Sequence, residues 1–206
     1  MGTSLSEVYN GFAETYEFNR GSFDISQILE KFSHLLPQNS GELLDLGCGA
    51  GEPVARYFIN KGWKVTGVDF SERMLELSAK YAPEMLAIRG DIREVEFQQS
   101  QFDAITATYS LFHIPAEEHA NIFRKIHRWL KPNAKVLFTY ATEKYTGAKK
   151  FNGYKRFIDT DLFYSHVTPE ELNSTLVEIG FDINSAEYHT ICNETFLWMT
   201  ASKKSS

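Results

Sequence analysis

The sequence predicts an α/β fold built on a doubly wound, mostly parallel sheet, and three observations support this. Short apolar runs alternate with stretches of helical period along most of the chain. The helical stretches are about 10–15 residues long, as expected for crossovers between parallel strands. A glycine-rich segment joins the first strand to the first helix. Right-handed crossovers then restrict the topology to the doubly wound class.

The elements of the first two thirds follow from apolar runs and their flanking residues. We expect strands at residues 42–46, 63–68, 85–89, 102–107 and 135–139. We expect helices between them, ending near residue 61 and spanning residues 71–81 and 116–130. Ser71 suits the N-cap of the second helix, and Lys131-Pro132 ends the third.

The C-terminal third contains one further helix and two strands. Thr168 suits an N-cap, acidic residues follow in the first turn, and Gly180 suits the end of a helix over 169–179. Two strands near 181–187 and 195–201 have no helix-length segment between them, so they should pair as an antiparallel hairpin.

We expect a single domain over residues 1–206. Residues 1–38 are helical in pattern and rich in aromatic side chains, and they should form an N-terminal cap or lid. Residues 39–206 then form the core, with an insertion at about 141–167.

Composition excludes several classes of protein. The 206 residues include 27 acidic and 21 basic side chains, a net charge of −6, which argues against a general nucleic-acid binder. Two cysteines cannot form a disulfide framework. No apolar run approaches the roughly 20 residues that cross a bilayer, and no signal-peptide pattern is present. We expect a cytoplasmic protein without nucleic-acid or membrane partners, as a monomer or homodimer.

The segment Leu43-Leu-Asp-Leu-Gly-Cys-Gly-Ala-Gly51 lies where the first strand meets the first helix. Ligands of open parallel sheets bind outside the carboxyl ends of strands, and glycine permits a close backbone approach. The dinucleotide fingerprint has its third glycine three residues after the second, whereas Glu52 stands there in this chain. Asp45 would repel a pyrophosphate and attract an amine. The segment therefore favours a nucleoside bearing an amino acid. The alternative is a turn needed for packing alone.

Two further acids follow the next two strands. Asp69 suits hydrogen bonds to ribose hydroxyls, and Asp91 is within reach of a base edge, with Phe70 and Ile92 as apolar walls. Each acid alone is more often a loop residue or a helix cap. Three acids at three successive strand ends indicate a nucleoside site.

With these motifs, the chain resembles the class I S-adenosylmethionine-dependent methyltransferases of the small-molecule type. The segments that carry the likeness are 44–51, 65–71, 90–92, 102–105, 129–133 and 171–181, so the resemblance covers about 40–200. It implies a Rossmann-like, seven-stranded sheet ordered 3-2-1-4-5-7-6 with the last strand antiparallel. It also implies S-adenosylmethionine as cofactor and S-adenosylhomocysteine as product.

The resemblance assigns roles to individual residues. The methionine moiety would contact Asp45 and the glycine segment, the ribose Asp69, the adenine Asp91, and the sulfonium Ala107. The predicted cofactor-binding residues are Tyr16, Asp45, Gly47, Cys48, Gly49, Gly51, Asp69, Phe70, Met74, Asp91, Ile92 and Ala107.

The sequence also offers candidate catalytic and substrate residues. Methyl transfer needs positioning and desolvation more than a base. His113 follows the fourth strand and is either structural or catalytic, whereas His119 and His127 should lie on the surface. Aromatic side chains of the cap and the insertion either pack these segments onto the sheet or line the substrate site. The candidate substrate residues are Tyr9, Tyr109 and Tyr164. No spacing resembles a zinc site, so no metal is expected.

The resemblance implies transfer of a methyl group to an O, N or C nucleophile of a small molecule. One alternative is a non-catalytic protein that binds S-adenosylmethionine or S-adenosylhomocysteine. A nicotinamide-dependent oxidoreductase is another, against which the glycine spacing and Asp45 argue.

Overall fold

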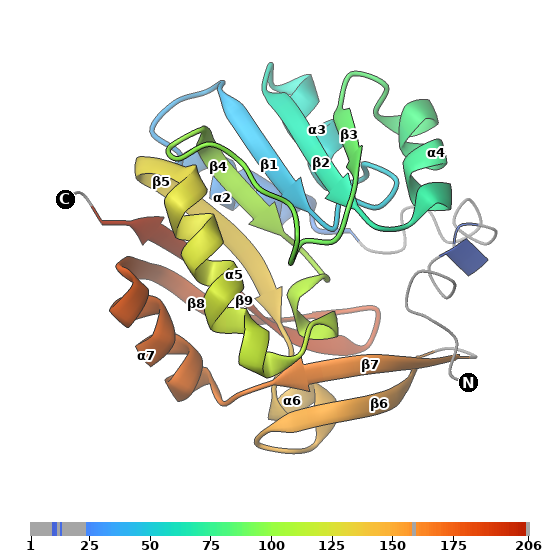
Figure 1. Cartoon of the computed structure of the whole chain (residues 1–206), viewed down its shortest axis with the longest axis vertical. Coiled ribbons are helices and arrows are strands. Elements are labelled where there is room, and N and C mark those ends of the chain that lie inside the picture. Colours follow the sequence, from blue (N-terminus) through green and yellow to red (C-terminus); the bar gives the residue numbers. More distant parts are fainter. Residues whose placement is uncertain (1–9, 12, 14–23, 158–159, 205–206) are drawn as a thin grey trace. The chain divides into compact units, whose positions relative to one another are not determined.

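The computed structural model describes residues 10, 11, 13, 24–157 and 160–204. Seven strands form a sheet in the order β3-β2-β1-β4-β5-β9-β8, and β6 and β7 form a second sheet. The predicted strand order is therefore confirmed, and the last two strands carry the numbers 9 and 8 because β6 and β7 precede them. The chain divides into two compact units, residues 1–95 and 96–206, which are described in turn. Their helices and strands are labelled in Figure 1. A single domain over 1–206 stays a prediction.

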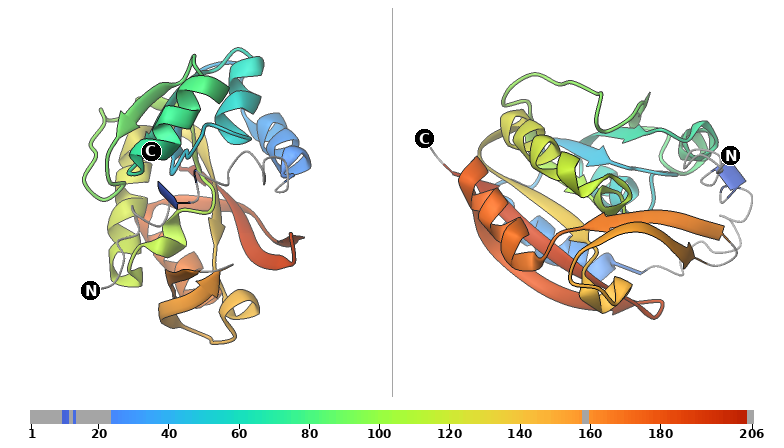
Figure 2. Two further views of the ribbon diagram at one scale, coloured as in Figure 1. Left: turned by 90° about the vertical axis from the view of Figure 1, so that its right-hand side faces the viewer. Right: turned by 60° about the horizontal axis from the view of Figure 1, so that its bottom comes forward.

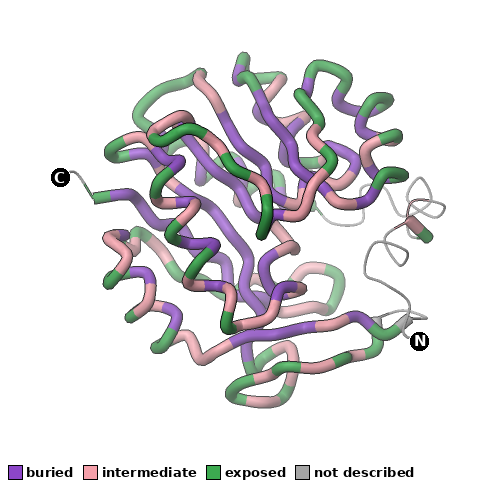
Figure 3. Tube along the Cα trace, in the orientation of Figure 1, coloured by how far each residue is buried: buried purple, intermediate pink, exposed green. Residues whose placement is uncertain are grey.

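The first unit supplies three parallel strands and the helices beside them. Its elements are α2 (Ser26–Leu35), β1 (Glu42–Leu46), α3 (Val54–Asn60), β2 (Lys64–Asp69), α4 (Glu72–Tyr81) and β3 (Leu86–Arg89). Strand β2 pairs in parallel with both β1 and β3. Strands β1 and β2 are buried along most of their length, as in a parallel sheet covered on both faces (Figure 3). The predicted strand bounds hold to within one residue.

Aromatic side chains attach α2 to α3. Phe58 of α3 is fully buried, and its ring centroid lies 5.6 Å from that of Trp63 and 6.2 Å from that of Phe32 in α2. Both pairs meet edge to face, the arrangement that the ring quadrupole favours. A hydrogen bond of 3.1 Å between the hydroxyls of Ser33 and Tyr57 joins the same helices.

The second unit contains the rest of the large sheet and the small one. Its elements are β4 (Phe102–Ala107), the 3-10 helix η1 (Leu111–His113), α5 (Ala116–Trp129), β5 (Leu130–Tyr140), α6 (Glu143–Thr146), β6 (Phe151–Phe157), β7 (Thr160–His166), α7 (Pro169–Ile179), β8 (Phe181–Ile191) and β9 (Glu194–Lys203). Strand β4 is parallel to β5, and β9 is antiparallel to β5 and to β8. The predicted C-terminal hairpin is confirmed. Strand β5 begins at Leu130, five residues before the predicted start.

The β8–β9 hairpin turns through Cys192 and Asn193. Their φ angles are +49° and +66°, and Ile191 pairs with Glu194 across the turn. A two-residue loop with both residues left-handed matches the twist of the flanking strands. Because the turn is this tight, Glu194 stands at the very start of β9, and the side chain of Cys192 is exposed.

The predicted insertion at 141–167 contains α6 and the β6–β7 hairpin (Figure 2). Along β6, Gly153 and Lys155 are half-buried, whereas Asn152, Tyr154 and Arg156 are exposed. This alternation follows the two-residue period of a strand. One face of the hairpin is therefore partly covered by the rest of the second unit, and Lys155 lies on that face.

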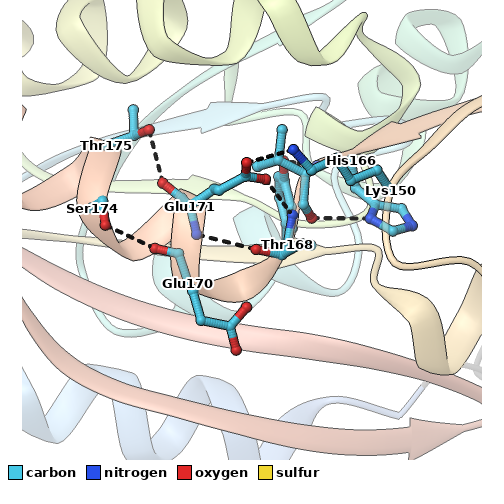
Figure 4. A network of polar contacts seen from close by, with 9 residues as sticks. Lys150, His166, Thr168, Glu170, Glu171, Ser174 and Thr175 are labelled. Atoms are coloured by element: carbon cyan, nitrogen blue, oxygen red, sulfur yellow. Dashed lines mark hydrogen bonds and ion pairs between the residues drawn. The ribbon is translucent and has the colours of Figure 1, made fainter.

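Thr168 is the N-cap of α7, as the sequence predicted, and it forms a capping box with Glu171. Thr168 Oγ1 accepts a hydrogen bond from Glu171 N at 3.3 Å, and Glu171 Oε2 accepts one from Thr168 N at 3.2 Å. Lys150 Nζ donates to the other carboxylate oxygen of Glu171, so the segment before β6 is attached to α7 (Figure 4). Gly180, with φ of +110°, ends the helix.

The expectation that His119 lies on the surface is wrong. The ring is buried: its Nδ1 accepts from Tyr140 Oη at 2.8 Å, and its Nε2 donates to the Ile114 carbonyl at 2.8 Å. His119 occupies the same helical stripe as Ile122, Phe123 and Ile126 of α5, which is buried. The apolar periodicity was therefore a better guide to burial than the residue type. His127 is half-buried against Phe181.

Candidate cofactor and acceptor sites

The glycine loop, residues 47–51, is held by the end of β2. The Val68 carbonyl accepts hydrogen bonds from Gly47 N at 2.8 Å and from Cys48 N at 3.1 Å. Asp69 Oδ2 accepts one from Gly49 N at 2.9 Å. These bonds fix the loop at the carboxyl ends of two neighbouring parallel strands, where open sheets of this kind bind ligands.

The glycines of the loop serve different purposes. Gly49 and Gly51 have φ of +52° and +79°. A Cβ at Gly51 would lie 2.6 Å from the Cβ of Ala82, whereas a Cβ at Gly49 would meet no described atom within 4 Å. Gly51 therefore allows close packing, and the backbone at Gly49 faces open space that a ligand can enter.

Cys48 is a packing residue of the loop. A Cβ at Gly67 would lie 2.7 Å from its Sγ, so glycine in β2 makes room for the thiol. Burial raises the pKa of Cys48 well above its usual value, and the charges of Asp45 and Asp69 raise it further. The thiol is therefore neutral and a poor nucleophile. Asp45 is itself buried and pairs in register with Gly67.

Asp69 is buried at the end of β2 and organises the turn around it. Besides binding Gly49 N, it accepts a hydrogen bond from Ser71 N on Oδ1 at 2.8 Å. Burial raises the pKa of Asp69, against the effect of these backbone donors. Because each carboxylate oxygen has two lone pairs, the same group can accept further hydrogen bonds from ligand hydroxyls.

The other predicted residues of this unit lie in α4 or directly beside α4 and β3. Met74 is buried against Ala50 and Tyr81, while Phe70 is half-exposed. The guanidinium of Arg93 holds the carboxylate of Asp91, with Nε 3.0 Å from both oxygens. The predicted adenine-facing acid thus already has a cationic partner. Ile92, beside it, is buried. Among the described residues, no group of three acids, histidines or cysteines is arranged to hold a metal ion.

Asn10 of the N-terminal segment lies against the first turn of α4. Its Oδ1 accepts hydrogen bonds from Ser71 Oγ at 2.8 Å and from Arg73 N at 3.4 Å. Ala13 packs against the cluster around Met74. No sequence signal pointed to Asn10. Tyr9 and Tyr16 lie outside the described residues, so their predicted roles stay predictions.

In the second unit, an aromatic cluster lies at the carboxyl ends of β4 and β5. Phe112 stacks on Phe196 with ring centroids 4.9 Å apart, and Tyr109 meets Trp198 edge to face at 5.5 Å. Tyr109 has φ of +55°, and its N–H donates to Thr139 Oγ1 at 2.5 Å. The members of the aromatic cluster are Tyr109, Phe112, Tyr145, Tyr164, Phe196 and Trp198. Ala107, the last residue of β4, is fully buried.

His113 lies beside this cluster, with its ring centroid 4.8 Å from that of Tyr164. Its Nδ1 is 2.7 Å from the Phe163 carbonyl oxygen, and since a carbonyl only accepts, Nδ1 carries the hydrogen. Burial lowers the pKa of His113 to about 4. The imidazole is therefore neutral near pH 7.

Glu194 was not predicted as a site residue, yet its carboxylate lies beside the aromatic cluster. Tyr145 Oη lies 3.0 Å from Glu194 Oε1 and 3.0 Å from Tyr164 Oη. A phenol has one hydrogen and a carboxylate only accepts, so Tyr145 donates to Glu194 and Tyr164 donates to Tyr145. Burial raises the pKa of both Tyr164 and Glu194.

Comparison with known proteins shows what this chain is similar to. Residues 43–133 match the family model described as methyltransferase domain. Bacillus subtilis YqeM, whose name describes a methyltransferase, is 32% identical over 136 residues, covering 64% of this chain and 54% of that protein. Phosphoethanolamine N-methyltransferase of Plasmodium falciparum is 26% identical over 175 residues, 82% of this chain and 63% of that protein. The chain thus spans little more than half the length of these curated relatives.

A solved structure has the same fold. The S-adenosylmethionine dependent methyltransferase from Mesorhizobium loti superposes with a TM-score of 0.70 over 86% of this chain and 96% of that chain, at 21% identity. Its likeness supports the strand order described above. Residues 43–133 are thus similar to the methyltransferase domain family, and the seven-stranded sheet has the fold of that solved methyltransferase.

Proposed function

We propose that this chain transfers a methyl group from S-adenosylmethionine to an O, N or C nucleophile of a small molecule. The observation that carries the proposal is the pairing of Gly49 with Asp69. The loop backbone faces open space at Gly49, and the carboxylate that holds this backbone lies at the end of the adjoining strand. A nucleoside needs both features, a close backbone approach and an acceptor for its ribose hydroxyls.

The residues present fit the cofactor. Asp69 would accept hydrogen bonds from the ribose, and the carboxylate of Asp45 would favour the positively charged amino group of the methionine moiety. Ile92 and Met74 supply apolar surface suited to adenine. Asp91 would interact with the adenine edge together with Arg93, which already binds its carboxylate. When bound, S-adenosylmethionine supplies a methyl group activated by the adjacent sulfonium.

His113 is better suited to positioning than to taking a proton. A general base works best when its pKa lies near the working pH, and a pKa of about 4 makes this imidazole a weak base at pH 7. Its Nδ1–H instead holds the Phe163 carbonyl, which fixes β7 beside η1. We propose Tyr109 and Tyr164 as aromatic walls for the methyl acceptor.

The proposal is tested first by calorimetry with S-adenosylhomocysteine. The wild-type chain should bind it, and Asp69→Ala should weaken binding by roughly 30- to 150-fold, because a buried charged hydrogen-bond pair contributes about 2–3 kcal/mol. Asp103→Ala, which removes a carboxylate bonded to Lys131, controls for the loss of an acid elsewhere and should bind normally. Equal affinity in all three proteins would contradict the cofactor site.

Turnover is tested by adding labelled S-adenosylmethionine to a cell extract with the purified chain. Appearance of a labelled small molecule that depends on Asp69 would support the enzyme. Binding without any labelled product would favour the non-catalytic alternative. Binding of a nicotinamide cofactor in place of S-adenosylhomocysteine would favour the oxidoreductase. The cytoplasmic location and the choice between monomer and homodimer stay proposals, to be tested by fractionation and light scattering.

A further inference from the structure

We propose that Glu194 and the ring of Tyr145 bind a positively charged nitrogen of the methyl acceptor, and that the acceptor is an organic amine. The inference rests on the proposed function, since it names the class of molecule that receives the methyl group. It concerns recognition of the acceptor and adds no covalent step.

Glu194 lies at the edge of the sheet where ligands of this architecture bind. Strand β9 runs antiparallel to β5, and Leu197 of β9 pairs with Tyr140 at the end of β5. The start of β9 therefore lies at the carboxyl end of β5. The helix α6, which carries Tyr145, follows that same end. Open α/β sheets bind ligands outside the carboxyl ends of their strands.

The surroundings of Glu194 suit a cation. Its carboxylate is half-buried, and the Tyr145 ring lies 4.4 Å from the Phe196 ring and 5.0 Å from the Tyr164 ring. A carboxylate beside aromatic rings is poorly solvated, which raises its pKa. An ammonium group can donate hydrogen bonds to the carboxylate oxygens of Glu194 and is attracted to the faces of the aromatic rings. Both interactions compensate for the poor solvation of the carboxylate.

The chain already places one ammonium at this position. Lys155 Nζ lies 4.9 Å from the centroid of the Tyr145 ring, and its charge lowers the pKa of Glu194. Lys155 reaches this ring from the inward face of β6. Because its ammonium is carried on a flexible stem, an acceptor amine can displace it. Lys155 therefore acts as a competitor that occupies the site when no acceptor is bound.

The experiment measures binding of n-butylammonium to the full chain saturated with S-adenosylhomocysteine, at constant ionic strength. The readout is tyrosine and tryptophan fluorescence, and 1-butanol serves as the neutral probe. Glu194→Gln should weaken butylammonium binding at least tenfold, as expected for loss of a charge-assisted hydrogen bond. Lys155→Met should strengthen it several-fold, because the internal competitor is gone. Binding of 1-butanol should change in neither variant.

Glu187→Gln is the matched control, since Glu187 is an exposed acid on the neighbouring strand β8, 3.5 Å from His189. It should bind butylammonium like the wild type. Affinity for S-adenosylhomocysteine, measured by calorimetry, should be the same in all variants and shows that each is folded.

The outcomes separate this inference from the proposed function. Wild-type affinity in Glu194→Gln, or no gain in Lys155→Met, overturns the cation site. A chain that methylates molecules of the extract but binds no butylammonium overturns it as well. A chain that binds butylammonium through Glu194 and never transfers a methyl group contradicts the enzyme while supporting the cation site.

Discussion

At the scale of single residues, two glycines two positions apart in the glycine loop have different tasks. Gly51 faces the Cβ of Ala82, and Gly49 faces open space. Both have positive φ, so alanine at either position carries a similar backbone cost of about 1 kcal/mol. Any further difference between the two variants therefore reports contacts of the side chain alone.

We expect Gly51→Ala to lower the melting temperature clearly more than Gly49→Ala, because a Cβ cannot lie 2.6 Å from another carbon. Gly49→Ala should lose affinity for S-adenosylhomocysteine while its circular dichroism stays that of the wild type. Thermal melts and calorimetry on the two proteins give both quantities. Normal cofactor affinity in Gly49→Ala would mean that the loop is only a packing turn.

A second residue-level prediction concerns His113 and pH. Its folded pKa of about 4 lies below the unfolded value of about 6.5, so below pH 6.5 the unfolded chain binds a proton that the folded chain does not. The free energy of unfolding should therefore decrease as pH falls from about 6.5 to about 4, by up to about 3 kcal/mol from this group.

Urea unfolding of the wild type and of His113→Phe over this pH range measures the effect. The slope with pH should be smaller in the variant, because one titrating group is lost. His34→Phe, at an exposed position in α2, is the matched control for replacing a histidine by phenylalanine. A slope in His113→Phe that equals that of the wild type would show that His113 titrates normally in the folded chain.

At the scale of elements, the ends of helices could be predicted from single capping residues. Ser71, Thr168 and Gly180 mark helix ends by their own hydrogen-bonding or backbone preferences, and the helices α4 and α7 start and stop beside them. The start of β5 was predicted late because Pro132 suggests a break, although β5 accommodates it. The β6–β7 hairpin was not predicted as strands.

The helix α7 offers a test of how much its cap contributes. Thr168→Ala removes the acceptor of Glu171 N and should destabilise the chain by about 1 kcal/mol, or a melting temperature lower by roughly 2–4 °C. Thr175→Ala, which removes a hydroxyl bonded back to the Glu171 carbonyl, is the control and should change the melting temperature little. Equal shifts in the two variants would contradict the capping role.

The candidate sites could likewise be predicted only where their residues follow a local sequence pattern, and not where residues far apart in the sequence come together. The glycine loop with Asp45 and Asp69 could be predicted because these residues lie at or beside the ends of consecutive strands. Glu194 could not, because its partner Tyr145 is 49 positions away and the register of β5 with β9 brings them together. Asn10 meets Ser71 from 61 positions away, without a motif to mark it.

At the scale of the whole molecule, we expect the N-terminal segment to act as a lid on the cofactor. Asn10 accepts a hydrogen bond from the Ser71 hydroxyl, and the Ser71 backbone N–H donates one to Asp69. Ser71 therefore connects Asn10 to the predicted ribose site. Cofactor binding should therefore slow hydrogen exchange across residues 8–23. Exchange followed by mass spectrometry with and without S-adenosylhomocysteine measures this.

The lid is also tested with the variant Asn10→Ala, which removes the acceptor of the Ser71 hydroxyl. Cofactor affinity should fall severalfold in this variant, and deletion of residues 1–20 should weaken it further without unfolding the sheet. Identical exchange in both states, together with full affinity in the deletion, would make the segment a packing appendage. Tyr16 would then have no place among the cofactor residues.

The tight turn between β8 and β9 has a practical consequence. The chain has two cysteines; Cys48 is buried with a raised pKa, whereas Cys192 is exposed, two positions before Glu194. A maleimide reagent should therefore attach a dye at one defined point on the native protein, and intact mass should increase by a single adduct. That dye would stand beside the carboxylate at the start of β9. Its emission would then allow acceptor candidates to be screened in solution before any product is known.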